Sequence, residues 1–177
     1  MQCDGLIERL ENEHTLSDAE LAGIISSDEY DAELAERADR VRRSIYGDEV
    51  FIRGLIEFTN YCKNDCYYCG IRRSNKSAVR YRLTEDEILA CCREGYRLGF
   101  RTFVLQGGED GFYTDAVMCG IISAIRTEFP DCAITLSAGE KSRESYKAYF
   151  DAGANRYLLR HETADGEHYK KLHPAGM

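Results

Sequence analysis

Apolar positions along the first part of the chain recur at helical spacing among many charged residues. Ser17 and Glu20 have the spacing of a capping box, in which each side chain caps the backbone amide of the other. Residues 4–46 are expected to be helical, with a long helix over residues 29–45 that Gly47 ends. We expect residues 1–47 to form a helical segment that serves packing.

From residue 50 onward, short apolar runs alternate with helical stretches. The runs that predict buried strands are residues 50–58, 102–106, 133–137 and 156–160. The expected helix starts are a Thr84–Glu87 capping box and N-caps at Thr114, Ser142 and Thr163. Alternation of this kind predicts an α/β fold with a parallel sheet and right-handed crossovers.

Four strand–helix units correspond to the first half of a (β/α) TIM-type barrel, which we expect over residues 48–177. A half barrel leaves open sheet edges, so the barrel is expected to be truncated. A doubly wound dinucleotide-binding sheet is the alternative. It is disfavoured because no G-x-G-x-x-G motif follows the first strand.

Composition narrows the class of protein. The 177 residues carry a net charge of −8, so no general attraction to nucleic acid or anionic membranes is expected. No apolar run approaches the length of a membrane span, and the N-terminus lacks a signal-peptide pattern. A cytoplasmic protein is therefore expected, in which the eight cysteines are ligands, catalytic groups or core thiols rather than disulfides.

Chemically distinctive residues follow every predicted strand, and parallel α/β folds bind ligands at the carboxyl ends of their strands. After the first strand, Cys62, Cys66 and Cys69 lie in one short segment. Thiolates suit both zinc and iron–sulfur clusters. A structural zinc site needs a fourth ligand, and no second close pair follows. A zinc site completed by His161 or another distant residue remains the alternative.

The other strand ends supply candidate ligand contacts. Gly107 and Gly108 would let the backbone approach a ligand ammonium, with Glu109 adding negative charge, or they would form a plain turn. Ser137 and Glu140 suit contacts to a ribose or an amino acid, or else mark a helix entrance.

Arg160 and Glu162 would share one side of an extended segment. Arg160 would then hold a carboxylate and Glu162 an ammonium or hydroxyl, unless they form an internal salt bridge. His161 would point the other way and pack. A basic run also follows the cysteines, and it would either steer anionic ligands or form a solvated loop. Its members are Arg72, Arg73, Lys76, Arg80 and Arg82.

The spacing C-x3-C-x2-C, with Tyr68 directly before the last cysteine, resembles the radical S-adenosylmethionine superfamily. The resemblance implies a 4Fe-4S cluster bound by Cys62, Cys66 and Cys69. Its open iron would bind S-adenosyl-L-methionine, whose reductive cleavage yields methionine and a 5′-deoxyadenosyl radical. The residues implied as cofactor contacts are Tyr68, Gly107, Gly108, Glu109, Ser137, Glu140, Arg160 and Glu162.

Longer stretches resemble the HydE family of [FeFe]-hydrogenase maturases. They are residues 56–76, 80–82, 104–110, 135–140 and 152–164. This resemblance implies H-cluster maturation on a small-molecule or iron-complex substrate, with HydG and HydF as partner maturases. The alternatives are a radical enzyme like methylornithine synthase (PylB) or biotin synthase, and a non-catalytic cysteine-rich metal-binding module.

Overall fold

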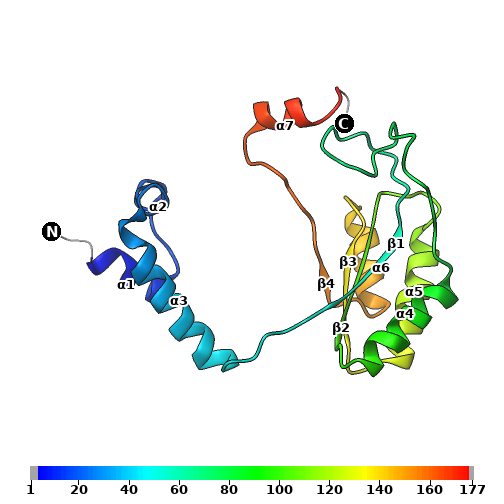
Figure 1. Cartoon of the computed structure of the whole chain (residues 1–177), viewed down its shortest axis with the longest axis horizontal. Helices are drawn as coiled ribbons and strands as arrows, with labels where there is room; N and C mark the ends of the chain where they lie inside the picture. The colour runs from blue at the N-terminus through cyan, green and yellow to red at the C-terminus, as the bar shows by residue number, and fades with distance from the viewer. Residues whose placement is uncertain (1–3, 176–177) are drawn as a thin grey trace. The chain divides into compact units, whose positions relative to one another are not determined.

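A computed structural model describes residues 4–175, and the chain divides into two compact units after Phe51. The first unit contains helices α1 (Asp4–Glu13), α2 (Asp18–Ile25) and α3 (Asp31–Tyr46), with a short 3-10 helix, η1 (Asp28–Tyr30) (Figure 1). The Ser17–Glu20 capping box is confirmed, and Gly47 ends α3 at a positive φ of 63°. The helical segment is interrupted at His14, which has a positive φ of 55°.

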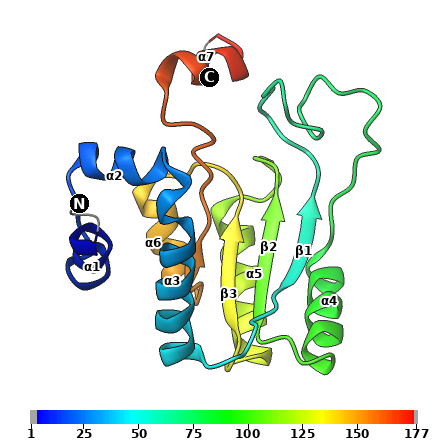
Figure 2. The same cartoon turned by 60° about the vertical axis from the view of Figure 1, so that its left-hand side comes forward.

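The second unit is built on a four-stranded parallel sheet in the order β1-β2-β3-β4, so the predicted α/β class is confirmed. The strands are β1 (Gly54–Thr59), β2 (Thr102–Gly107), β3 (Ala133–Ser137) and β4 (Arg156–Tyr157). The helices are α4 (Glu85–Arg97), α5 (Asp115–Glu128), α6 (Arg143–Asp151) and α7 (Gly166–Leu172). Figure 2 shows α4, α5 and α6 along one face of the sheet.

Alternation along the strands separates the two faces of this sheet. The helix-covered face buries Phe58, Phe103 and Leu136, each at most 1% exposed, against apolar residues of α4 and α5. Burying one such side chain contributes about 1.5–3 kcal/mol. The opposite face carries polar side chains such as Gln106 and Ser137, and this face lines the cleft described below.

Two strands are shorter than predicted. β1 begins at Gly54 rather than residue 50, because Gly54 pairs with Phe103 near the start of β2 and the residues before it have no partner strand. β4 has two residues rather than five, and it pairs with β3 through Arg156 and Tyr157. Beyond β4, the Leu158 amide still donates to Leu136, after which the chain leaves the sheet.

Helix starts follow the sequence closely, with one exception. The Thr84–Glu87 capping box and the caps at Thr114 and Ser142 are confirmed. The predicted cap at Thr163 was wrong, because α7 is capped by Asp165, which accepts hydrogen bonds from two amides of the first turn. Thr163 instead accepts a hydrogen bond from the Asp165 amide.

Candidate functional site

A cleft of about 1030 Å³ lies at the carboxyl ends of the strands. Every residue expected from the sequence as a cluster ligand or cofactor contact lines it. They are Cys62, Cys66, Tyr68, Cys69, Gly107, Gly108, Glu109, Ser137, Glu140, Arg160 and Glu162. Ligand clefts commonly have volumes of roughly 300–1,000 Å³, so this one can admit a nucleoside-sized molecule. The structure therefore brings the candidate residues together, while their individual roles remain predictions.

A β-bulge at the end of β1 introduces the cysteine loop, defined here as residues 60–75. The pairing with β2 shifts between Glu57 and Thr59, and bulges re-aim side chains beside functional sites. Thr59 is buried, and its hydroxyl donates to Asp110 at 2.8 Å and accepts from the Tyr61 amide at 3.1 Å. This side chain therefore fixes the direction in which the loop leaves the sheet.

The three cysteines are half-buried, free thiols. Burial raises the pKa of the Cys66 thiol, and metal binding would displace its proton. Among residues 4–175, no three His, Cys, Asp or Glu side chains converge on a point where one metal ion could bind. A zinc site needs such convergence, whereas a four-iron cube takes each cysteine on a different iron. Three thiols on one short loop match the donor set of a four-iron cube.

The other cysteines within residues 4–175 have no place in the cleft. Adjacent positions on α4 point in different directions, as expected, with Cys91 exposed and Cys92 buried. Burial raises the pKa of Cys92 to about 12. Cys132 is buried in the core, and the partly buried Cys119 packs against the same core, so both are core thiols. Cys3 lies outside the described residues.

Gly108 lets the second strand's loop approach the cysteine loop closely. A Cβ on Gly108 would lie 2.2 Å from the Tyr61 carbonyl oxygen and 2.7 Å from Cys62 Cβ. A Cβ on Gly107 would lie 2.7 Å from a methyl carbon of Thr59. These glycines therefore make room for β1 and its loop, a requirement that the sequence pattern did not reveal.

Glu109 is held by groups of the protein itself. Its carboxylate contacts Lys63 Nζ at 3.0 Å and accepts a hydrogen bond from Asn64 Nδ2 at 2.8 Å. A hydrogen bond and the charge of Glu109 raise the pKa of Lys63. The Glu140 amide, at the end of β3, also donates to Glu109 at 3.4 Å. Glu109 thus links the cysteine loop to the neighbouring strand end, in addition to lining the cleft.

Arg160 and Glu162 both line the cleft, but they do not form the internal salt bridge weighed from the sequence. No ion pair joins them in the part of the chain that the structure describes. Arg160 Nη2 donates instead to Gln106 Oε1 at 3.3 Å. Glu162 has a positive φ of 62°, so the assumed extended segment ends before it. The expectation that His161 packs was wrong, since its side chain is exposed and lines the cleft.

The basic run after the cysteines divides into two groups. Arg72, Arg80 and Arg82 donate to backbone carbonyls or to Asp110. Arg73 and Lys76 are exposed. Three members of the run therefore hold the loop in place, and anion steering by the run stays a prediction.

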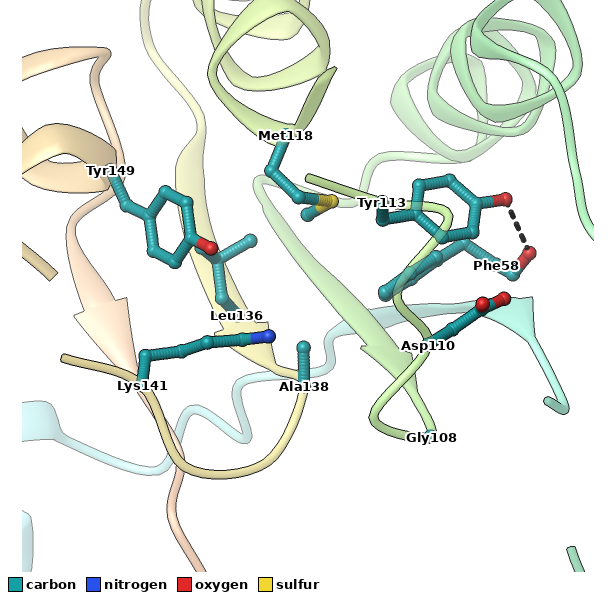
Figure 3. Close-up of a pocket in the computed structure, with 9 residues that line it drawn as sticks. All are labelled: Phe58, Gly108, Asp110, Tyr113, Met118, Leu136, Ala138, Lys141 and Tyr149. Carbon is teal, nitrogen blue, oxygen red and sulfur yellow. Dashed lines mark hydrogen bonds between the residues drawn. The ribbon is translucent and has the colours of Figure 1, made fainter. Parts of the chain in front are cut away.

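Several residues of the cleft were missed from the sequence, and two of them make notable contacts. His173 is buried and contacts Tyr68. It lies far from the cysteine motif in sequence, and no motif around His173 indicated this contact. Lys141 lines both the cleft and an adjoining pocket of about 10 Å³, room for about one water molecule. Figure 3 shows the Lys141 side chain crossing this pocket between Tyr149 and Ala138. The only sequence signal for Lys141 at the cleft was its position directly after Glu140.

Comparison with known proteins identifies the family of the chain. The Radical SAM superfamily matches residues 56–176. The [FeFe] hydrogenase maturase subunit HydE of Thermotoga maritima is 44% identical over 96% of this chain and 48% of its own length. Within residues 4–175 there is no helix long and apolar enough to cross a membrane.

Solved structures support the fold. The crystal structure of methylornithine synthase (PylB) has a TM-score of 0.82 and 31% identity, over 97% of this chain and 51% of that one. The structure of HydG, a maturase of the [FeFe]-hydrogenase, has a TM-score of 0.85 and 25% identity, over 97% and 40%. The chain thus spans about half the length of the relatives it matches. Its cysteine loop, its parallel sheet and the matched residues together show that it belongs to the Radical SAM superfamily.

Proposed function

We propose that the chain forms the cofactor-binding half of a radical S-adenosylmethionine enzyme that acts in [FeFe]-hydrogenase maturation. The observation that carries the chemistry is the cysteine loop opening into the 1030 Å³ cleft beside the other three strand ends. The similarity to a HydE maturase supports the biological role. Residues 48–177 would be the first half of the barrel, and residues 1–47 a helical segment before it.

Within this proposal, Cys62, Cys66 and Cys69 hold a 4Fe-4S cluster. When bound, the cluster supplies the electron that breaks a carbon–sulfur bond of S-adenosylmethionine, giving methionine and a 5′-deoxyadenosyl radical. The thiols release their protons on binding iron. Because they lie on one loop at the rim of the cleft, the protein leaves the side toward the cleft free for the second cofactor.

The remaining cleft residues would bind S-adenosylmethionine. Arg160 offers a guanidinium for the carboxylate, and Glu162 offers a carboxylate for the ammonium or a ribose hydroxyl. Tyr68 presents an aromatic ring for the adenine, and Ser137 and Glu140 present polar groups from the end of β3. The substrate would be a small molecule or iron complex, exchanged with the partner maturases HydG and HydF.

Anaerobic reconstitution with iron and sulfide tests the cofactor assignment. The expected product is a brown protein whose electron paramagnetic resonance spectrum changes on adding S-adenosylmethionine. Cys66→Ser should lose the cluster, whereas Cys91→Ser, at an exposed site on α4, should keep it. A colourless protein with one tightly bound zinc would contradict the proposal.

The similarity to the PylB structure favours a second candidate, a methylornithine synthase. Complementation separates the two roles. The gene should restore hydrogenase activity in a strain lacking its HydE maturase and should not restore 3-methylornithine formation in a strain lacking that synthase. The opposite result would establish the second candidate.

A further inference from the structure

Arg80 closes the base of the cysteine loop. Its guanidinium donates to the carbonyl oxygens of Asn60 and Ile71 from Nη1, the second at 2.8 Å. From Nη2 it donates to the carbonyls of Arg72 at 2.7 Å and Asn75 at 3.1 Å. One side chain therefore bonds to both ends of the segment that carries the three cysteines.

Burial does not hold this loop in place. No residue from Tyr61 to Gly70 is fully buried, so apolar packing contributes little to its conformation. Hydrogen bonds must therefore hold it. Inside the loop, the Arg73 amide donates to the Asn64 carbonyl at 2.9 Å, and the Ser74 amide donates to Asp65 at 2.9 Å. These bonds shape the loop, and the Arg80 contacts join its two ends.

The contacts of Arg80 flank the ligands closely. Asn60 lies two residues before Cys62, and Ile71 lies two residues after Cys69. A planar guanidinium can bridge several carbonyls in fixed directions, whereas a lysine ammonium is a point charge on a flexible stem. Fixing both ends also removes chain entropy that metal binding would otherwise have to offset.

We propose that Arg80 is a positioning residue that holds the cysteine loop in its cluster-binding conformation before iron is bound. The inference rests on the proposed function only in that the loop binds a cluster; the ordering of the loop concerns the metal-free protein. The matched control is Arg73, an exposed arginine on the same loop whose backbone amide, rather than its side chain, makes the internal bond.

Hydrogen–deuterium exchange of the metal-free protein tests the proposal. In Arg80→Lys, amides of residues 60–75 should exchange at least about tenfold faster, while those of α5 keep their rates. Arg73→Lys should exchange like the wild type. After anaerobic reconstitution, Arg80→Lys should lose iron to a chelator about tenfold faster than either of the other proteins.

Each other outcome overturns a specific statement. Unchanged loop exchange in Arg80→Lys would show that Arg80 does not order the loop. Equal acceleration in α5 would show a general structural role. A loosened loop that retains iron as well as the wild type would refute the link to the cluster. If the wild type takes up no iron, the proposed function fails, while the exchange result still decides whether Arg80 orders the loop.

Discussion

The hydroxyl of Tyr68 lies 3.3 Å from Nε2 of His173, and the two rings meet edge to face with centroids 5.6 Å apart. The His173 ring also stacks on the Tyr169 ring, with the two centroids 3.9 Å apart, and this contact fixes its position. The Tyr67 amide also donates to the Leu172 carbonyl at 2.9 Å. The end of α7 therefore sets the orientation of the aromatic side chain within the cysteine motif.

His173→Phe should weaken S-adenosylmethionine binding by about three- to tenfold, because an aromatic ring is kept but the hydrogen bonds to Tyr68 and to the Tyr169 carbonyl are lost. Iron content should not change, since His173 does not contact the cysteines through any described bond. The measurement is a titration of the reconstituted protein with S-adenosylmethionine. His168→Phe, at an exposed position of α7, is the control. Equal losses in both variants would contradict a specific role for His173.

Gly108→Ala should prevent the cysteine loop from seating against β2. The new Cβ would overlap the Tyr61 carbonyl oxygen and the Cys62 side chain. Overpacking of this kind lowers the free energy of unfolding by about 1–3 kcal/mol, and here the strain falls on Cys62, the first cysteine of the motif. We expect lower stability in urea and lower iron content. Gly111→Ala is the control, because a Cβ there meets nothing within 4 Å. Full iron uptake by Gly108→Ala would show that the loop tolerates the displacement.

Local signals in the sequence predicted most of the fold. The capping boxes at Ser17 and Thr84 depend on residues three apart, so they could be recognised without knowing the tertiary structure. The length of β4 depends on its pairing with β3 and could not be read from its apolar residues. The same reason explains why β1 begins later than its apolar run.

The sequence predicted which residues lie at the site better than it predicted their contacts. All expected cluster ligands and cofactor contacts line the cleft because parallel strands end at the same edge of the sheet. The interactions of Glu109 with Lys63, and of Tyr68 with His173, join segments whose proximity arises only on folding. The positive φ of Glu162 ends the assumed extended segment and is a tertiary feature, although Glu162 lines the cleft as expected.

Asp110→Asn should destabilise the second unit by about 2–3 kcal/mol at neutral pH. Arg82 donates to both carboxylate oxygens at 2.7 and 2.9 Å, and removing one charge of such a pair leaves the other uncompensated. We expect a smaller loss of stability than for a fully buried ion pair, because the Arg82 side chain is 36% exposed and water screens its charge. Urea unfolding measures the loss. Asp131→Asn, in an exposed pair with Arg101, should cost less than about 1 kcal/mol.

The Asp110 contribution should depend on pH in one direction. Burial opposes ionisation, but hydrogen bonds from Arg82, the Phe112 amide and Thr59 outweigh it and lower the pKa of Asp110. A carboxyl whose folded pKa is depressed stabilises the fold above its unfolded pKa of about 3.9, and this stabilisation is lost as pH falls through the folded value. The stability gap between wild type and Asp110→Asn should therefore narrow below about pH 4. A gap that stays constant down to pH 3 would refute this account.

Arg160→Ala should weaken S-adenosylmethionine binding by about 10- to 100-fold, since a hydrogen bond to a charged group contributes about 1.5–3 kcal/mol. The only described hydrogen bond of the Arg160 side chain goes to the neutral Gln106 amide, at 3.3 Å, so its charge remains available to an anionic ligand. Arg156→Ala is the control, because Arg156 lies where β4 begins, away from the cleft residues. Binding is measured by titrating the reconstituted protein, with iron content confirmed to be equal. Unchanged affinity in Arg160→Ala would remove this residue from the cofactor site, and an equal loss in Arg156→Ala would indicate a general effect of surface charge.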